Sequence, residues 1–130
     1  MPHRDGSVLV VEDDPEINEL VGSYAQIAGY DYDPALTGNA GLELARAHAP
    51  VLIILDIMLP DVDGFEVCRQ LKLEQSTRNI PVMILTALDA DEHRQRGREC
   101  GAVAFLTKPF DPDNLLEAIR RHAAHNGHDR

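Results

Sequence analysis

Residues 51–65, VLIILDIMLPDVDGF, decide the fold, because five apolar residues run directly into an acidic residue and then into a turn. An apolar run of this length without alternation is typical of a strand that is buried on both faces of a parallel sheet. Asp56 stands where that strand ends, and Asp63-Gly64 indicates a turn into a helix. A strand followed by a helix is the unit from which α/β folds are built.

Three more apolar runs share this pattern and predict buried strands at residues 8–11, 82–85 and 103–106. A weaker strand candidate spans residues 30–36, where Pro34 argues against a central position because proline has no backbone N–H to donate. The best defined helix is predicted between Asp14-Pro15 and Gly29. Its buried stripe is expected to comprise Ile17, Leu20, Val21, Tyr24 and Ile27.

The remaining helices are expected at residues 39–48, after Gly64, at residues 89–100 and from Pro112 onward. The helix at 89–100 has few apolar residues, so we expect it to pack loosely. Strand and helix alternate five times, which predicts an α/β fold with a five-stranded, doubly wound parallel sheet. We expect one domain over residues 1–124, and a polar tail or the start of a linker at 125–130.

Composition narrows the class of protein. The 130 residues suffice for one ordinary domain, and the formal net charge of −10 argues against direct binding to nucleic acid or to anionic membranes. No apolar run approaches the roughly 20 residues that a membrane-spanning helix needs. The N-terminal stretch turns acidic too soon for a signal peptide. Cys68 and Cys100 are interpreted as small core residues, and a reducing, cytoplasmic location is expected.

Polar residues lie at the ends of four predicted strands. Because parallel strands end at the same edge of a sheet, their side chains should meet there. Crowded carboxylates repel one another, by on the order of 4 kcal/mol for two charges about 4 Å apart at an effective dielectric near 20. A divalent cation relieves that repulsion, and oxygen ligands with access to water favour Mg²⁺. The residues are Glu12, Asp13 and Asp14 on the first strand, Asp56 on the third, Thr86 on the fourth and Lys108 on the fifth.

This set of residues suits phosphoryl transfer. Asp56 is a carboxylate nucleophile able to form an aspartyl phosphate. Lys108 supplies a compact positive charge for a phosphoryl oxygen, and Thr86 supplies a hydroxyl donor. Each residue alone has an ordinary structural interpretation, such as a helix cap for Asp56 or a solvated charge for Lys108. Their combination on the correct strand ends favours chemistry, and Asp56 is the predicted phosphoacceptor.

Four segments carry a resemblance to a known family: VLVVEDDPEI from residue 8, LIILDIMLPDVDGFEVCRQL from residue 52, VMILTAL from residue 82 and CGAVAFLTKPFDPDNL from residue 100. In order and spacing they are similar to bacterial response-regulator receiver domains, over roughly residues 8–123. The resemblance implies the CheY-like, flavodoxin-like strand order 2-1-3-4-5. It also implies a signalling switch rather than an enzyme. A sensor histidine kinase or phosphotransfer protein would donate the phosphoryl group, and a downstream protein or output domain would respond.

The resemblance implies a metal site. Asp13 and Asp56 would bind Mg²⁺ directly, together with the backbone carbonyl of Met58, and Glu12 would act mainly through water. Asp14 aligns with a variable position, so it is assigned to capping the following helix.

The resemblance also implies a switch. Thr86 would swing toward the phosphoryl group, Lys108 would bridge to a phosphoryl oxygen, and Pro109 would follow a cis peptide bond. Phe105 would be the coupled aromatic residue that turns inward. The family often has tyrosine at the position of Phe105, so any inward turn here proceeds without a hydroxyl group.

Met58 and Leu88 lie two residues beyond Asp56 and Thr86, at positions where polar residues of the family help to orient hydrolytic water. Both are apolar here, which predicts slow self-dephosphorylation. Met58 also argues against one alternative, an aspartate-nucleophile phosphatase, which needs a second acid at that position. The acidic residues 12–14 argue against the other, a flavodoxin-like flavin or nucleotide binder, because they would repel phosphate.

The charged dimer interface of the family is incomplete in this sequence. Val103-Ala104 and Ala118 stand where an acidic residue and an arginine are common. A winged-helix output domain, and the charged dimer interface that accompanies it, are therefore less expected. A phosphorylation-dependent homodimer of another kind is still an open alternative. These residues do not identify the cognate kinase, the signal or any output domain beyond Arg130.

Overall fold

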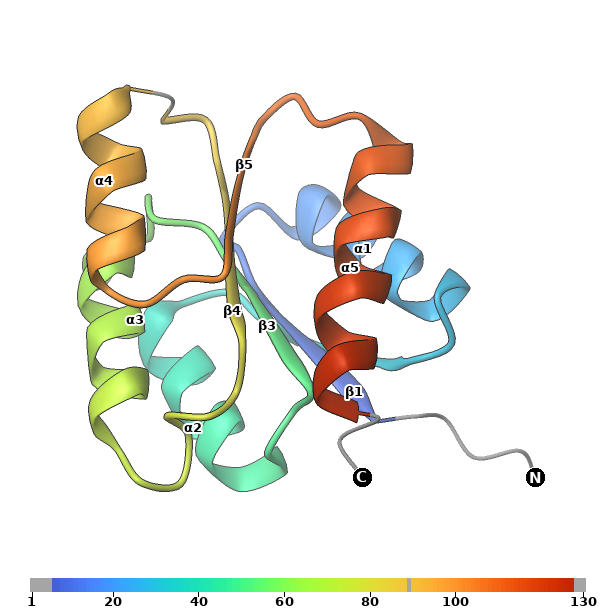
Figure 1. Cartoon of the computed structure of the whole chain (residues 1–130), viewed down its shortest axis with the longest axis horizontal. Coiled ribbons are helices and arrows are strands. Elements are labelled where there is room, and N and C mark those ends of the chain that lie inside the picture. The colour runs from blue at the N-terminus through green and yellow to red at the C-terminus, as the bar shows by residue number, and fades with distance from the viewer. Residues whose placement is uncertain (1–5, 89, 128–130) are drawn as a thin grey trace.

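The computed structural model describes residues 6–88 and 90–127, with side chains described through residue 123. Its centre is one parallel sheet with the strand order β2-β1-β3-β4-β5 (Figure 1). This order confirms the predicted doubly wound α/β fold. The strands are β1 (Ser7–Val11), β2 (Asp31–Ala35), β3 (Leu52–Leu55), β4 (Val82–Thr86) and β5 (Ala104–Thr107).

Burial explains the apolar runs of the sequence. Every residue of β3 and β4 is buried, so these strands have no solvent-facing positions at which polar residues would alternate. β2 forms one edge of the sheet, and Pro34 lies opposite Val10 within it. The expectation that proline excludes this segment from the centre of the sheet is confirmed.

Helices cover both faces of the sheet, with α1 and α5 on one face and α2, α3 and α4 on the other (Figure 1). Each face has its own apolar core. α5 continues through Gly127, so residues 125–127 are helical, while residues 128–130 lie outside the described part. Among the described residues, no helix is long and apolar enough to cross a membrane. The helices are α1 (Pro15–Ile27), α2 (Gly38–His48), α3 (Gly64–Leu73), α4 (Asp91–Glu99) and α5 (Pro112–Gly127).

The face that α1 buries differs from the predicted stripe. Leu20 and Ile27, expected inside, are 48% and 60% exposed. The helix is rotated because small residues let it lie close to the sheet: a Cβ atom on Gly22 would be 2.4 Å from the ring of Tyr32 on β2. The buried residues are Asn18, Val21, Gly22 and Ala25, which follow helical spacing but include a polar residue.

α4 packs weakly, as its composition predicts. It begins at Asp91, and its N-cap residue Ala90 makes no side-chain cap bond. Gly97 is the one buried residue of this helix, all of which lies in the described part of the chain. With so little apolar surface removed from water, α4 is held less firmly than its neighbours.

The two cysteines lie together in the core between α3 and the end of α4. Cys68 is buried and Cys100 is half-buried, and both are free thiols. The Cys68 thiol donates to the carbonyl oxygen of Cys100 at 3.3 Å. This placement confirms the interpretation of both residues as core residues.

Candidate functional site

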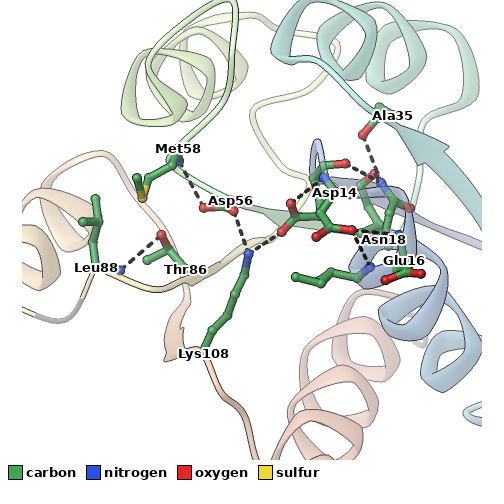
Figure 2. Close-up of polar contacts among 12 residues, drawn as sticks. Asp14, Glu16, Asn18, Ala35, Asp56, Met58, Thr86, Leu88 and Lys108 are labelled. Atoms are coloured by element: carbon green, nitrogen blue, oxygen red, sulfur yellow. Dashed lines mark hydrogen bonds and ion pairs between the residues drawn. The ribbon is translucent and has the colours of Figure 1, made fainter.

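The predicted site residues meet at the carboxyl edge of the sheet (Figure 2). The ladder of backbone hydrogen bonds continues up to them. The amide of Asp56 donates to the Val11 carbonyl at 2.9 Å, and the amide of Lys108 donates to the Thr86 carbonyl at 2.9 Å. The sheet therefore fixes these residues at neighbouring strand ends.

Lys108 lies at the centre of the site. Its Nζ atom is 2.5 Å from Oε1 of Glu12 and 2.8 Å from Oδ2 of Asp56. The Lys108 side chain is 17% exposed, and the carboxylate side chains are 5% and 6% exposed. Buried charges are tolerated only when they are paired and hydrogen-bonded. One ammonium group meets that requirement for both carboxylates and ties together the ends of β1, β3 and β5.

The pKa values of the two buried carboxylates shift in opposite directions. Burial alone would raise the pKa of Asp56, but hydrogen bonds from Lys108 and the Met58 amide, with the lysine charge, lower the pKa below its ordinary value. For Glu12, burial dominates and raises the pKa to about 7, although the hydrogen bond from Lys108 acts in the opposite direction. The neighbouring Asp56 adds to that rise. Near neutral pH, Asp56 is therefore the ionised carboxylate, the state that a nucleophile needs.

The raised pKa of Glu12 predicts that the metal-free protein loses stability as the pH rises. The folded protein keeps the Glu12 proton up to a pKa of about 7, whereas in the unfolded chain the pKa is near the ordinary 4.5. The stabilisation is thus complete at pH values below the unfolded pKa and is lost as the pH rises through the folded one. We expect a loss of about 2–3 kcal/mol in the free energy of unfolding.

Urea unfolding in a chelator, from about pH 5 to pH 8, would measure this decline. Glu12→Gln is expected to flatten it, because the amide does not titrate. Asp56, with its lowered pKa, changes stability only at more acidic pH and does not interfere in this window. A variant whose stability falls with pH as steeply as that of the wild type would contradict the prediction.

Three carboxylates stand close enough to hold a cation. Glu12, Asp13 and Asp56 each offer an oxygen, and these atoms lie within 4.8 Å of one another. Asp13 is exposed while the other two are buried, so the cluster is open to water on one side. Hard divalent cations that retain water, Mg²⁺ foremost, suit this set of donors. The cluster therefore fits the metal site expected from the sequence.

Backbone amides that follow β3 and β4 donate hydrogen bonds to the side chains of the site. The amide of Met58 donates to Oδ1 of Asp56 at 3.0 Å, and the amide of Leu88 donates to Oγ1 of Thr86 at 3.4 Å (Figure 2). Thr86 is completely buried, whereas the Met58 side chain is 55% exposed. Leu88 packs against the apolar cluster below α4. Both residues predicted to flank the site are thus held beside it by their own backbone.

Phe105 lies beside the site rather than in it. Its ring is half-buried between β5 and α4, and a Cβ atom on Gly97 would approach it to 3.0 Å. The guanidinium carbon of Arg94 lies 4.9 Å from the ring centroid. Phe105 thus contacts the weakly packed helix α4 directly. The expected cis peptide bond between Lys108 and Pro109 is present.

One functional feature of the first helix escaped the sequence analysis, and another was predicted. Asp14 was assigned to capping, and it does accept hydrogen bonds from the amides of Glu16 and Ile17. Asn18, by contrast, was not singled out, although it is 1% exposed and bonded to three carbonyl groups at the end of the sheet. The available signal was a polar residue one position beyond Ile17, inside an otherwise apolar helical face.

Comparison with known proteins agrees with this geometry. A family model described as the response regulator receiver domain matches residues 8–120. The DNA-binding dual master transcriptional regulator RpaA of Synechocystis is 44% identical over 113 residues, which are 87% of this chain and 47% of RpaA. Response regulator PleD of Caulobacter vibrioides is 42% identical over 113 residues, 86% of this chain and 25% of PleD. The chain thus spans half or less of the length of these curated relatives.

Solved structures show the same likeness. A CheY-like receiver domain protein from Methanospirillum hungatei superposes with a TM-score of 0.85 at 26% identity, covering 93% of this chain and 95% of that one. The receiver domain of Francisella response regulator 1452 gives a TM-score of 0.84 at 31% identity, with 92% and 98% covered.

The fold, the acidic site and these matches define a phosphoacceptor domain that acts in signalling. The chain belongs to the response-regulator receiver domains of two-component systems. Receiver domains of this family interact with kinases and with output domains. The predicted family and function are confirmed, and neither the phosphatase nor the nucleotide-binding alternative is favoured.

Proposed function

We propose that Asp56 is the phosphoacceptor of this receiver domain. The observation that carries the proposal is a buried carboxylate with a lowered pKa at a strand end, 2.8 Å from a lysine ammonium and beside two more carboxylates. A carboxylate oxygen of Asp56 attacks the phosphorus atom of a phosphohistidine on a kinase or phosphotransfer protein. The P–N bond breaks, the imidazole nitrogen keeps the electron pair and takes a proton, and an aspartyl phosphate forms.

The acidic cluster supplies the metal site for that reaction. Asp13 and Asp56 would hold Mg²⁺ with the backbone carbonyl of Met58, and Glu12 would act through water. When bound, Mg²⁺ supplies positive charge for the oxygens of the transferring phosphoryl group. The fit rests on three carboxylate oxygens within 4.8 Å of one another and on the open side at Asp13.

Lys108 and Thr86 respond to the new phosphoryl group. Formation of the acyl phosphate removes the negative charge of the Asp56 carboxylate, so the Lys108 ammonium transfers its contact from Oδ2 to a phosphoryl oxygen. The Thr86 hydroxyl, which accepts from the Leu88 amide at 3.4 Å, turns to donate to the phosphoryl group. Phe105 then moves inward, and the face formed by α4, β5 and α5 changes shape for a partner.

The chain itself catalyses phosphorylation of its own aspartate and slow self-dephosphorylation, without turnover of an external substrate. Its lysine and metal ligands lower the barrier to attack by Asp56, whereas the apolar side chains of Met58 and Leu88 do not activate a hydrolytic water. The exposed Met58 side chain occupies the position where a phosphatase of the aspartate-nucleophile class carries its general acid.

The aspartyl phosphate is expected to persist for minutes or longer, because the flanking side chains of Met58 and Leu88 offer a water molecule no hydrogen bond. Met58→Asn is expected to shorten its lifetime several-fold without reducing the initial incorporation. Following the intact mass of the phosphorylated protein in Mg²⁺ buffer would measure the decay, with the exposed Leu73→Asn as the control. Loss of the phosphoryl group within seconds in the wild type would contradict the prediction.

We further propose that the partners are a sensor histidine kinase or phosphotransfer protein and a downstream protein or output domain. RpaA, which is described as DNA-binding, and PleD both extend well beyond the matched segment, which supports an output function outside the receiver fold. A phosphorylation-dependent homodimer is compatible with the same switch. The free thiols of Cys68 and Cys100 suit a cytoplasmic setting.

A small-molecule phosphodonor tests the proposal without a cognate kinase. Incubation with acetyl phosphate and MgCl₂ is expected to add one phosphoryl group to the intact chain, located by peptide mapping at Asp56. The modification is expected to require a divalent cation and to disappear in a chelator. Incorporation at another residue, or none with Mg²⁺ present, would overturn the assignment.

A further inference from the structure

The side-chain amide of Asn18 closes the carboxyl end of β1. Its Nδ2 atom donates to the carbonyl oxygens of Val10 at 3.1 Å, Glu12 at 3.0 Å and Ala35 at 3.1 Å. Val10 and Ala35 lie at the ends of the neighbouring strands β1 and β2, and Glu12 directly follows β1. The two N–H groups of one amide are therefore shared among three acceptors, in a site that is only 1% exposed.

The amide of Asn18 is not needed to cap or stabilise its own helix α1. Asp14 already caps α1 by accepting hydrogen bonds from the Glu16 and Ile17 amides. A buried amide without partners costs a few kcal/mol, so its contacts must compensate for the missing apolar side chain. All three hydrogen bonds that it donates lead away from the helix, to the ends of β1 and β2 and to Glu12.

Tyr32 holds the amide in the orientation that this contact requires. Its hydroxyl group donates to Oδ1 of Asn18, which directs Nδ2 toward the carbonyl groups. The Tyr32 ring in turn lies against Gly22, where any Cβ atom would overlap it. Residues from α1 and β2 thus cooperate in placing one donor.

Glu12 receives this support on both sides of its backbone. Its amide donates to the Ala35 carbonyl at 3.0 Å, and its carbonyl accepts from Asn18. Its carboxylate accepts from the Asp14 amide at 2.9 Å through Oε2. The peptide unit between Glu12 and Asp13 therefore has a fixed plane, which sets where the Asp13 carboxylate projects.

We propose that Asn18, oriented by Tyr32, is a positioning residue for the metal site, which it serves by fixing the peptide unit between Glu12 and Asp13. The proposal rests on the proposed function of the acidic cluster as a Mg²⁺ site. Without the donor, the Glu12 carbonyl is free to rotate and the Asp13 carboxylate loses its fixed place beside Asp56. Asn18 touches neither the metal nor the phosphoryl group, and it acts only through the backbone.

Two variants isolate the contacts. Asn18→Leu keeps the size of the side chain and removes every donor, whereas Tyr32→Phe keeps the ring against Gly22 and removes the hydroxyl. Thr77→Val is the matched control, because Thr77 is also fully buried and donates to the Leu71 carbonyl at 2.7 Å, in the connection before β4 at the opposite edge of the sheet. Titration of each ¹⁵N-labelled protein with MgCl₂, followed by NMR, would measure the affinity for Mg²⁺.

Asn18→Leu is expected to weaken Mg²⁺ binding about tenfold, the low end of the loss that follows removal of an outer-shell partner. Tyr32→Phe is expected to weaken it about threefold, since the donors remain but their orientation is lost. Thr77→Val is expected to lower the melting temperature and leave the affinity for Mg²⁺ unchanged. Unchanged affinity for Mg²⁺ in both Asn18→Leu and Tyr32→Phe would overturn the proposal. If Asn18→Leu does not fold, the affinity of Tyr32→Phe is the test.

Amide exchange of the metal-free proteins separates this proposal from the proposed function. Asn18→Leu or Tyr32→Phe is expected to speed exchange at the amides of Glu12 and Asp14 relative to Thr77→Val, whatever Mg²⁺ does. If the wild type binds no Mg²⁺, the metal site of the proposed function fails, and faster exchange at these two amides still supports the positioning role. Exchange as slow as in the control would overturn that role.

Discussion

Replacement of Asp56 by asparagine is expected to reduce phosphoryl incorporation from acetyl phosphate to the background of the uncatalysed reaction. The asparagine amide has a similar shape but is a far weaker nucleophile than a carboxylate, so no acyl phosphate forms. The substitution also removes the charge that holds the Lys108 ammonium at 2.8 Å and one of the three oxygens of the acidic cluster. Intact mass after incubation with MgCl₂ gives the result directly.

Asp14→Asn is the matched control for that substitution. It makes the same chemical change at the same edge of the sheet, and asparagine caps a helix about as well as aspartate does. Because Asp14 caps α1 and stands outside the three-carboxylate cluster, its variant is expected to be phosphorylated as fully as the wild type. Incorporation that survives Asp56→Asn, or that is lost in Asp14→Asn, would place the phosphoacceptor elsewhere.

Gly64→Ala is expected to destabilise the protein by about 3–4 kcal/mol, a loss large for a single methyl group. The added Cβ atom would lie 2.4 Å from Cα of Ile57 and 2.6 Å from the carbonyl oxygen of Asp56. Both are backbone atoms, which cannot rotate away as a side chain does. The Gly64 amide also donates to the Ile57 carbonyl at 2.9 Å, so the clash would break a contact that anchors α3 to the phosphoacceptor loop.

Urea unfolding monitored by circular dichroism would measure this loss. Gly29→Ala serves as the comparison, because Gly29 has φ +103° and no atom within 4 Å of an added Cβ. That variant carries backbone strain alone and is expected to lose about 1–2 kcal/mol. A Gly64→Ala protein as stable as Gly29→Ala would show that the loop relaxes around the methyl group.

The strands and the site were predictable because both depend on local pattern and on one rule of topology. Residues 51–55 and 82–85 are apolar without alternation, since both faces of β3 and β4 are covered. Once the strands are parallel, the residues at their carboxyl ends must adjoin, which brings Asp56 and Lys108 together from 52 positions apart in the chain.

Other features depend on packing that sequence does not specify. The rotation of α1 follows from how closely Gly22 approaches the Tyr32 ring, so hydrophobicity alone favoured Leu20, which is exposed. The role of Asn18 depends on three carbonyl groups that converge only in the folded sheet. The raised pKa of Glu12 results from burial beside Asp56, and no property of an isolated glutamate anticipates it.

The Lys108 ammonium contacts both Glu12 and Asp56, and it acts as a counter-ion that is covalently part of the chain. Because the chain supplies that charge at a high effective concentration, Glu12 and Asp56 have a positively charged partner before any free cation arrives. An incoming cation must therefore compete with a charge that cannot diffuse away. Hydrolysis of the proposed acyl phosphate at Asp56 would leave the Lys108 ammonium in place to restore its contacts at 2.5 Å and 2.8 Å.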